Sequence, residues 1–160
     1  MSEPDLITIP SQPEPGDRFY CVGVDGTGNQ FMGFVTGAFP HNNYPDLDQD
    51  WRGIKRWYAV MHHFGADGNH LRTEAWCAGT SADDFEVGEA AFQRLDQMFG
   101  AIVRPVQRPI RVRPFSYSDG VYLFELFPEQ DPDESGRTAY VWLQPNDVMF
   151  HNPWDGEYST

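Results

Sequence analysis

The chain lacks the features by which several classes of protein are recognised. It has two cysteines in 160 residues, too few for a disulfide framework. Cys21 and Cys77 both lie in apolar, strand-like patterns, so we expect buried free thiols in a reducing compartment. No apolar run approaches the roughly 20 residues of a membrane span, and no basic segment precedes an apolar one at the start. These absences predict a soluble, cytoplasmic protein made without a cleaved signal.

Motifs for metals and phosphate are also missing. The five histidines show no spacing such as His-x-x-x-His. Aspartates of residues 46–50 match the first ligand positions of a calcium loop, but Trp51 replaces the required glycine and Trp57 the bidentate glutamate. Residues 25–29 contain glycines, yet no lysine and no helix follow to hold a phosphate. We therefore expect no metal and no cofactor.

Positive charge is scarce. The sequence has 24 acids against 11 bases, a formal net charge of −13. This balance steers the protein away from nucleic acid and anionic lipid, and towards basic partners. The imbalance is greatest in residues 129–160, which hold seven acids and one base, Arg137.

Aromatic residues are abundant, at 15% of the chain, which argues against disorder. A chain of this length forms one domain that buries roughly 70% of its unfolded surface. We assign that domain to residues 17–160. Residues 1–16 contain four prolines and are expected to form a flexible or extended arm, in which residues 6–9 favour one short edge strand.

The segment from Trp57 to Ile102 predicts strand, tight turn, strand and helix. Residues 67–69 supply the glycine and polar residues of a hairpin turn, and residues 71–77 alternate as a returning strand. Thr80 and Ser81 offer an N-cap for a helix over residues 82–99. Its apolar positions, spaced for one helical face that lies on a sheet, are Phe85, Phe92, Leu95 and Phe99.

Further alternating segments separated by turn residues predict more strands. The expected fold class is therefore α+β, with a mainly antiparallel meandering sheet of about seven to nine strands and one main helix packed on it. The additional predicted strands are residues 18–24, 30–39, 110–113, 121–127, 138–143 and 148–150.

Aromatic residues on partly polar strand faces indicate a protein interface. Tyr140 and Trp142 share one strand face, and Trp76 shares another with Arg72 and Glu74. A second helix layer, or the tail with Trp154 covering that face, is the alternative. The residues predicted to bind a partner are Asp131, Asp133, Glu134, Tyr140, Trp142, Trp154, Asp155 and Tyr158.

A second hypothesis starts from Glu125, the single acid in the most apolar predicted strand. If Glu125 faces inward, its neutral form is favoured unless Arg111 or Arg113 pairs with it. Together with His62, these side chains would line a pocket between helix and sheet. The alternative is a structural carboxylate that faces outward or pairs with arginine.

Three functions remain open. The leading expectation is a small acidic module that binds a basic protein, with the general character of small bacterial immunity proteins that neutralise toxins. This is a comparison of class, because no residue pattern identifies a family. The alternatives are an enzyme or small-ligand-binding protein with the pocket above, and a phage or accessory structural protein that assembles with itself, a homodimer included. Neither cysteine lies where a thiolate would be activated, so binding is favoured over catalysis.

Overall fold

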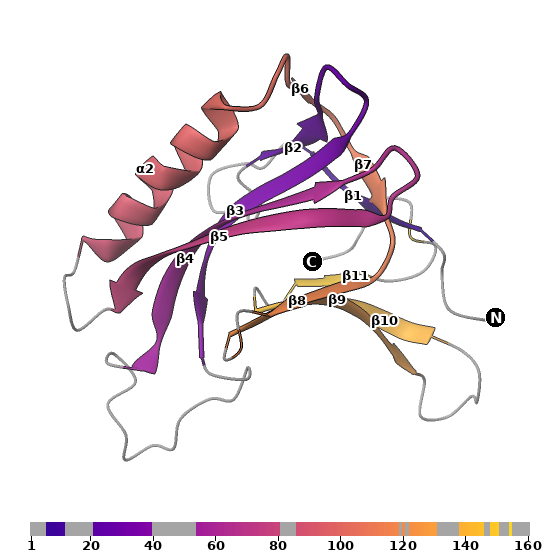
Figure 1. The fold of residues 1–160 in the computed structure, drawn as a ribbon. Helices are drawn as coiled ribbons and strands as arrows, with labels where there is room; N and C mark the ends of the chain where they lie inside the picture. The colour runs from indigo at the N-terminus through magenta and orange to yellow at the C-terminus, as the bar shows by residue number, and fades with distance from the viewer. Residues whose placement is uncertain are drawn as a thin grey trace.

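A five-stranded antiparallel sheet built around two hairpins forms the centre of the structure (Figure 1). Its strand order is β5–β4–β3–β2–β6. The computed structural model describes residues 6–11, 21–39, 54–80, 86–118, 120, 122–130, 138–145, 148–150 and 154. The strands of this sheet are β2 (Cys21–Val24), β3 (Gln30–Ala38), β4 (Arg56–Phe64), β5 (His70–Thr80) and β6 (Val106–Gln107).

Both hairpins close with the same turn. The turns span residues 25–29 and 65–69, and in each the N–H of the first residue donates to the carbonyl of the last over 2.8 Å. Gly28 and Gly68 occupy the fourth position with φ of 91° and 89°. Residues with a Cβ rarely adopt this conformation, so the fourth position of each turn requires glycine. Asparagine follows the glycine in both turns, and the two turns have the same geometry. The predicted hairpin turn at residues 67–69 is confirmed, and the predicted strands on either side of residues 25–29 pair as a second hairpin.

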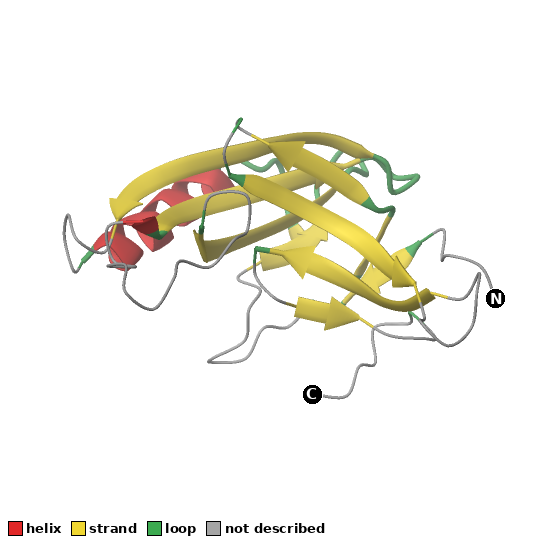
Figure 2. Ribbon diagram, turned by 90° about the horizontal axis from the view of Figure 1, so that it is seen from below, coloured by secondary structure: helices red, strands yellow, loops and turns green. Residues whose placement is uncertain are grey.

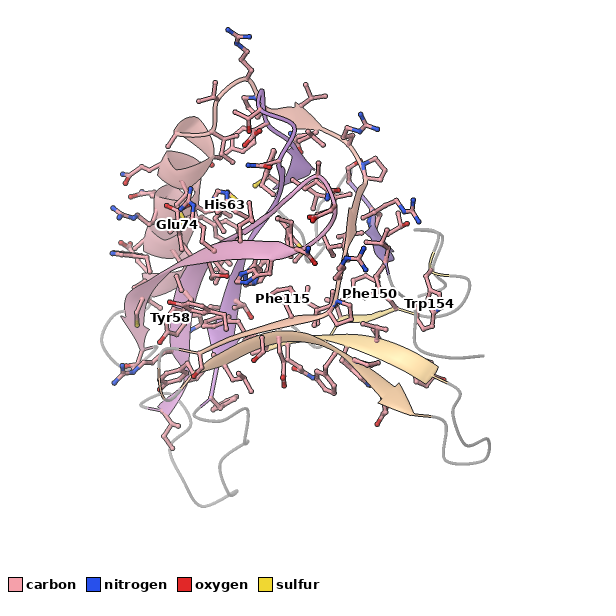
Figure 3. All side chains as sticks on the ribbon, turned by 45° about the vertical axis from the view of Figure 1, so that its right-hand side comes forward. Tyr58, His63, Glu74, Phe115, Phe150 and Trp154 are labelled. Carbon is pink, nitrogen blue, oxygen red and sulfur yellow. The ribbon has the colours of Figure 1, made fainter. Side chains whose placement is uncertain are left out.

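A four-stranded antiparallel sheet packs against one face of the first sheet (Figures 1 and 2). Its order is β11–β10–β9–β8, and its strands are β8 (Phe115–Ser118), β9 (Leu123–Gln130), β10 (Thr138–Gln144) and β11 (Val148–Phe150). Alternate side chains of the two sheets meet in one core, and Figure 3 shows Tyr58 and Phe115 between them. Large members of this core are Phe34, Tyr58, Phe64, Phe124, Leu143 and Phe150.

A pair of short strands extends the same core. β1 (Ile7–Ile9) pairs antiparallel with β7 (Ile110–Val112). Ile7 and Ile9 are both 0% exposed. The predicted short strand near the N-terminus is therefore present, and it contributes to the hydrophobic core.

The helix α2 (Val87–Gly100) covers the opposite face of the five-stranded sheet (Figure 1). Leu95 is fully buried in a second core cluster that also contains Met61. Trp76 packs against this cluster, and the Arg94 guanidinium lies 5.6 Å from its ring centroid. The helix layer therefore covers Trp76, one of the aromatic residues whose strand faces indicated an interface.

One position of the predicted helical stripe is wrong. Phe92 is 46% exposed, whereas Leu95 is 0% exposed. Each residue advances about 100° around a helix. Because Ala91 and Leu95 face the sheet, Phe92 lies to the side of the contact face. Phe99 remains partly buried, and its ring centroid lies 5.9 Å from that of Phe31.

Two other local predictions need correction. The helix begins at Val87 and Thr80 belongs to β5, so Thr80 does not cap the helix. Residues 81–85, which include Ser81 and Phe85, lie outside the described residues. Cys21 is buried as predicted, but Cys77 is exposed. Cys77 lies on the edge strand β5, where no neighbouring described strand covers it.

The predicted class, a mainly antiparallel α+β fold with one helix on a sheet, is confirmed. The single sheet of about seven to nine strands is wrong, because the described residues form eleven strands in sheets of five, four and two. Both faces of the five-stranded sheet carry apolar side chains. One helix covers only one of those faces, so a second sheet is needed to bury the other.

Candidate functional site

The four-stranded sheet has one face that points away from the core (Figures 1 and 2). In β10, Val141 and Leu143 are buried between the sheets, so alternation directs Tyr140 and Trp142 to the opposite side. β9 and β11 follow the same pattern. We give the name outer-face patch to six of the outward side chains: Glu125, Phe127, Glu129, Tyr140, Trp142 and Met149.

Strand register gathers the apolar members of the outer-face patch into one row. Trp142 is the cross-strand partner of Phe127 on one side and of Met149 on the other. Cβ atoms of such direct partners lie about 5 Å apart, so the three side chains stand side by side across the sheet. Tyr140 and Met149 are 39% and 41% exposed. Large apolar side chains thus reach solvent on two adjacent strands, and Phe127 on the third is partly exposed.

Two carboxylates border this row. The Trp142 indole N–H donates to Glu129 Oε2 over 2.9 Å, which fixes the tryptophan ring on the sheet. Glu125 is partly buried, and this burial raises the pKa of its carboxyl group. The described residues form no ion pair with Glu125. Glu125 is therefore a partly desolvated acid, which a nearby cation would stabilise.

The structure brings together some of the predicted partner-binding residues and not others. Tyr140 and Trp142 lie in the outer-face patch. Trp154 lies elsewhere: it packs on the core between the sheets, and its carbonyl accepts a hydrogen bond from the Thr8 N–H over 3.1 Å (Figure 3). The remaining predicted residues lie outside the described part of the chain; they are Asp131, Asp133, Glu134, Asp155 and Tyr158.

The four residues of the predicted pocket do not converge. His62 is fully buried between the sheets, whereas Glu125 lies on the outer face of the second sheet. Arg111 is exposed on β7, and its backbone pairs with the Gln30 side chain. Arg113 is partly buried just after β7. The pKa shift of Glu125 has burial as its cause, with no contribution from an arginine.

His62 belongs to a polar cluster inside the aromatic core. The Thr73 hydroxyl lies 2.7 Å from His62 Nδ1 and 2.7 Å from His70 Nε2. A hydroxyl donates one hydrogen bond, so it donates to one ring and accepts from the other. The Phe115 ring stacks on His70 and meets His62 edge-on, each with 4.7 Å between ring centroids.

Burial controls the charge of this cluster. Burial lowers the pKa of His62 well below its ordinary value, and His70 and His63 add smaller repulsive contributions. His62 Nε2 has no hydrogen-bond partner among the described residues, so a proton added there would be buried without an acceptor from them. Burial likewise lowers the pKa of His70. The cluster is therefore neutral and joins β4, β5 and β8 as a structural unit.

Two apolar members of the outer-face patch escaped the sequence prediction. Phe127 and Met149 lie in apolar strands, where such residues are usually assigned to the core. The alternation along β9 does indicate that Phe127 faces outward. Phe127 lies on the same face as Glu125, whereas Phe124 and Leu126 lie on the opposite, buried face.

Within the described ranges, no group of three or more His, Cys, Asp or Glu side chains is arranged to hold a metal ion. None of the described helices has the length and apolar character needed to cross a membrane. The sequence matches no family model, and comparisons with curated proteins and with solved structures find no similar protein.

Proposed function

We propose that this protein is a binding module that engages a basic protein through the outer-face patch. The observation that carries the proposal is the row of Phe127, Trp142 and Met149, which is partly exposed to solvent and bordered by Glu125 and Glu129. Interfaces are enriched in aromatic residues and methionine, and tryptophan is frequent among residues that dominate binding energy.

Charge supports a basic partner over a neutral one. The chain carries a net charge of −13, so its field accelerates encounter with a positive surface. Glu125 adds a local preference, since a lysine or arginine placed beside it would offset the cost of its partial burial. An inhibitor that neutralises a basic toxin or effector, as immunity proteins do, is one form that this function takes.

The proposal divides the roles of the two kinds of side chain. Carboxylates should act mainly on the association rate, whereas the aromatic row should act on the dissociation rate. Glu129→Gln keeps an acceptor for the Trp142 indole while removing the charge, so it separates the two roles.

Comparative affinity capture from the native host tests the proposal. The baits are the wild type, Trp142→Ala and Phe92→Ala. Phe92 is a matched control, being an aromatic residue that is 46% exposed on the helix layer. We expect a basic protein that is retained by wild type and Phe92→Ala and is lost with Trp142→Ala. A specifically captured protein that binds all three baits equally, or an acidic one, would refute the proposal.

A further inference from the structure

The five-stranded sheet ends in a long open edge. β5 has eleven residues and stands last in the strand order, paired with β4 on one side. No strand in the described ranges pairs with its other side, and Figures 1 and 2 show it at the rim of the sheet. An unpaired strand edge offers backbone N–H and carbonyl groups that another strand can join.

Two irregularities limit the part of β5 that can accept a strand. The pairing of β4 with β5 shifts register between Trp57 and Tyr58 and again between His63 and Phe64. Residues 72–77 therefore form the regular stretch, opposite residues 58–63 of β4. Because bulges end regular pairing and protect edges, an added strand is confined to this stretch and its immediate neighbours.

The charges on this stretch are self-complementary. The side chains of Arg72 and Glu74 are 61% and 40% exposed and lie two positions apart, on one face of the strand. If two copies of β5 pair antiparallel about Thr73, Arg72 of each copy faces Glu74 of the other, and residues 72–74 are the regular stretch that both copies contribute. Centring the pair on Arg72 or on Glu74 places like charges opposite each other instead.

The side chains next to this stretch are placed so that a second β5 can pair in this register. Thr73, at its centre, directs its hydroxyl inward to His62 and His70. His63 and Arg72 both contact Oε2 of Glu74, over 2.7 Å and 3.5 Å, so Oε1 can accept Arg72 of a second copy. Leu71 is 55% exposed at the same edge. Contact with a second copy would bury part of its apolar surface, which favours association.

We propose that β5 is a self-association edge, to which a second copy of this chain adds its own β5 antiparallel about a two-fold axis at Thr73. Two five-stranded sheets would then form one continuous sheet. The surface is separate from the outer-face patch, so the proposal does not rest on the proposed function. At physiological salt, charges beyond about 8 Å are largely screened, which limits repulsion between the two acidic chains.

Sedimentation equilibrium at physiological salt tests this proposal through charge reversal. We expect the wild type to form dimers, and Arg72→Glu or Glu74→Arg to raise the dimer dissociation constant about tenfold, since each places like charges opposite at two positions. The double variant R72E/E74R restores opposite charges in the same register, so its dissociation constant should return to within about threefold of the wild-type value. Circular dichroism and urea unfolding check that each variant folds.

Controls separate this edge from other surfaces. Trp142→Ala, in the outer-face patch, should dimerise like the wild type. The proposal is overturned if the wild type stays monomeric up to about 100 µM, or if the single charge reversals leave the dissociation constant unchanged. It is also overturned if Trp142→Ala abolishes the dimer, because the contact would then lie on the outer face.

Discussion

The side chain of Gln30 and the backbone of Arg111 form a reciprocal pair of hydrogen bonds that ties the five-stranded sheet to β7. The Arg111 N–H donates to Gln30 Oε1 over 2.7 Å, and Gln30 Nε2 donates to the Arg111 carbonyl over 2.9 Å. Nε2 also donates to the Gly65 carbonyl over 2.9 Å. One buried amide thus joins the start of β3, the β4–β5 turn and β7.

Removal of this amide should be costly. Gln30→Leu fills similar space but leaves the Arg111 N–H and carbonyl without this partner, and the Gly65 carbonyl keeps only its hydrogen bond from the Gly68 N–H. We expect a loss of about 3 kcal/mol or more in the free energy of unfolding, measured by urea denaturation. Gln30→Glu retains the acceptor for Arg111 and replaces the donor by a carboxylate oxygen facing two carbonyls. Its deficit should shrink as the pH is lowered and that carboxylate is protonated; a Gln30→Leu protein as stable as the wild type would contradict this role.

The corrected helix face predicts a contrast between neighbouring positions. Leu95→Ala should lower the free energy of unfolding by about 2–5 kcal/mol, because Leu95 is 0% exposed beneath the helix. Phe92→Ala should cost less than about 1 kcal/mol, because the side chain is 46% exposed. Urea unfolding of both variants under identical conditions compares them directly. Equal losses of stability in the two variants would show that Phe92 packs against the sheet after all.

Stability should fall as the pH drops below about 6.5, the ordinary pKa of histidine. The unfolded chain binds a proton at His62 in this range, whereas the buried ring of the folded chain does not. The unfolded state therefore binds more protons, and each such group lowers stability by up to about 1.4 kcal/mol per pH unit. His62→Leu should make the dependence shallower between pH 7 and 5. It should not abolish it, because burial also lowers the pKa of His70. Urea titrations at each pH measure the slope; an unchanged slope in His62→Leu would refute this.

The two thiols should differ sharply in reactivity. Burial raises the pKa of Cys21 to about 12, against a smaller opposing hydrogen bond from the Gly33 backbone, whereas Cys77 is exposed. The thiolate is the reactive form, so a disulfide reagent at neutral pH should label Cys77 alone in the native protein and both thiols in urea. Cys77→Ser should leave the native protein unlabelled. Rapid native labelling of that variant would show that Cys21 is accessible.

The predictable part of the fold lies in its local chemistry. Gly28 and Gly68, each followed by asparagine, specify two hairpins, and alternation specifies most strands. Alternation shows which residues share a face but not which layer covers that face, so Trp76 could not be assigned to the helix contact in advance. The same limit concealed the second sheet, whose existence depends on packing between segments distant in the chain.

The candidate site was predictable only in part for the same reason. Tyr140 and Trp142 stood out because bulky aromatic side chains alternate with core residues in a polar region. Glu125 was recognised as unusual, but its direction depended on which side of β9 faces the core. That direction is set by the burial of Phe124 and Leu126. Phe127 and Met149 were missed because an apolar residue in a strand is usually assigned to the core, although the alternation places Phe127 on the same face as Glu125.

Selection of peptides from a random displayed library on immobilised protein tests the central claim most directly, because the natural partner need not be identified first. Wild type, Trp142→Ala and Phe92→Ala are used in parallel. The account predicts that peptides enriched on the wild type carry net positive charge, bind Phe92→Ala equally, and lose binding to Trp142→Ala by about tenfold or more. Enriched peptides without positive charge, or with undiminished binding to Trp142→Ala, would contradict the claim that the outer-face patch binds a basic partner.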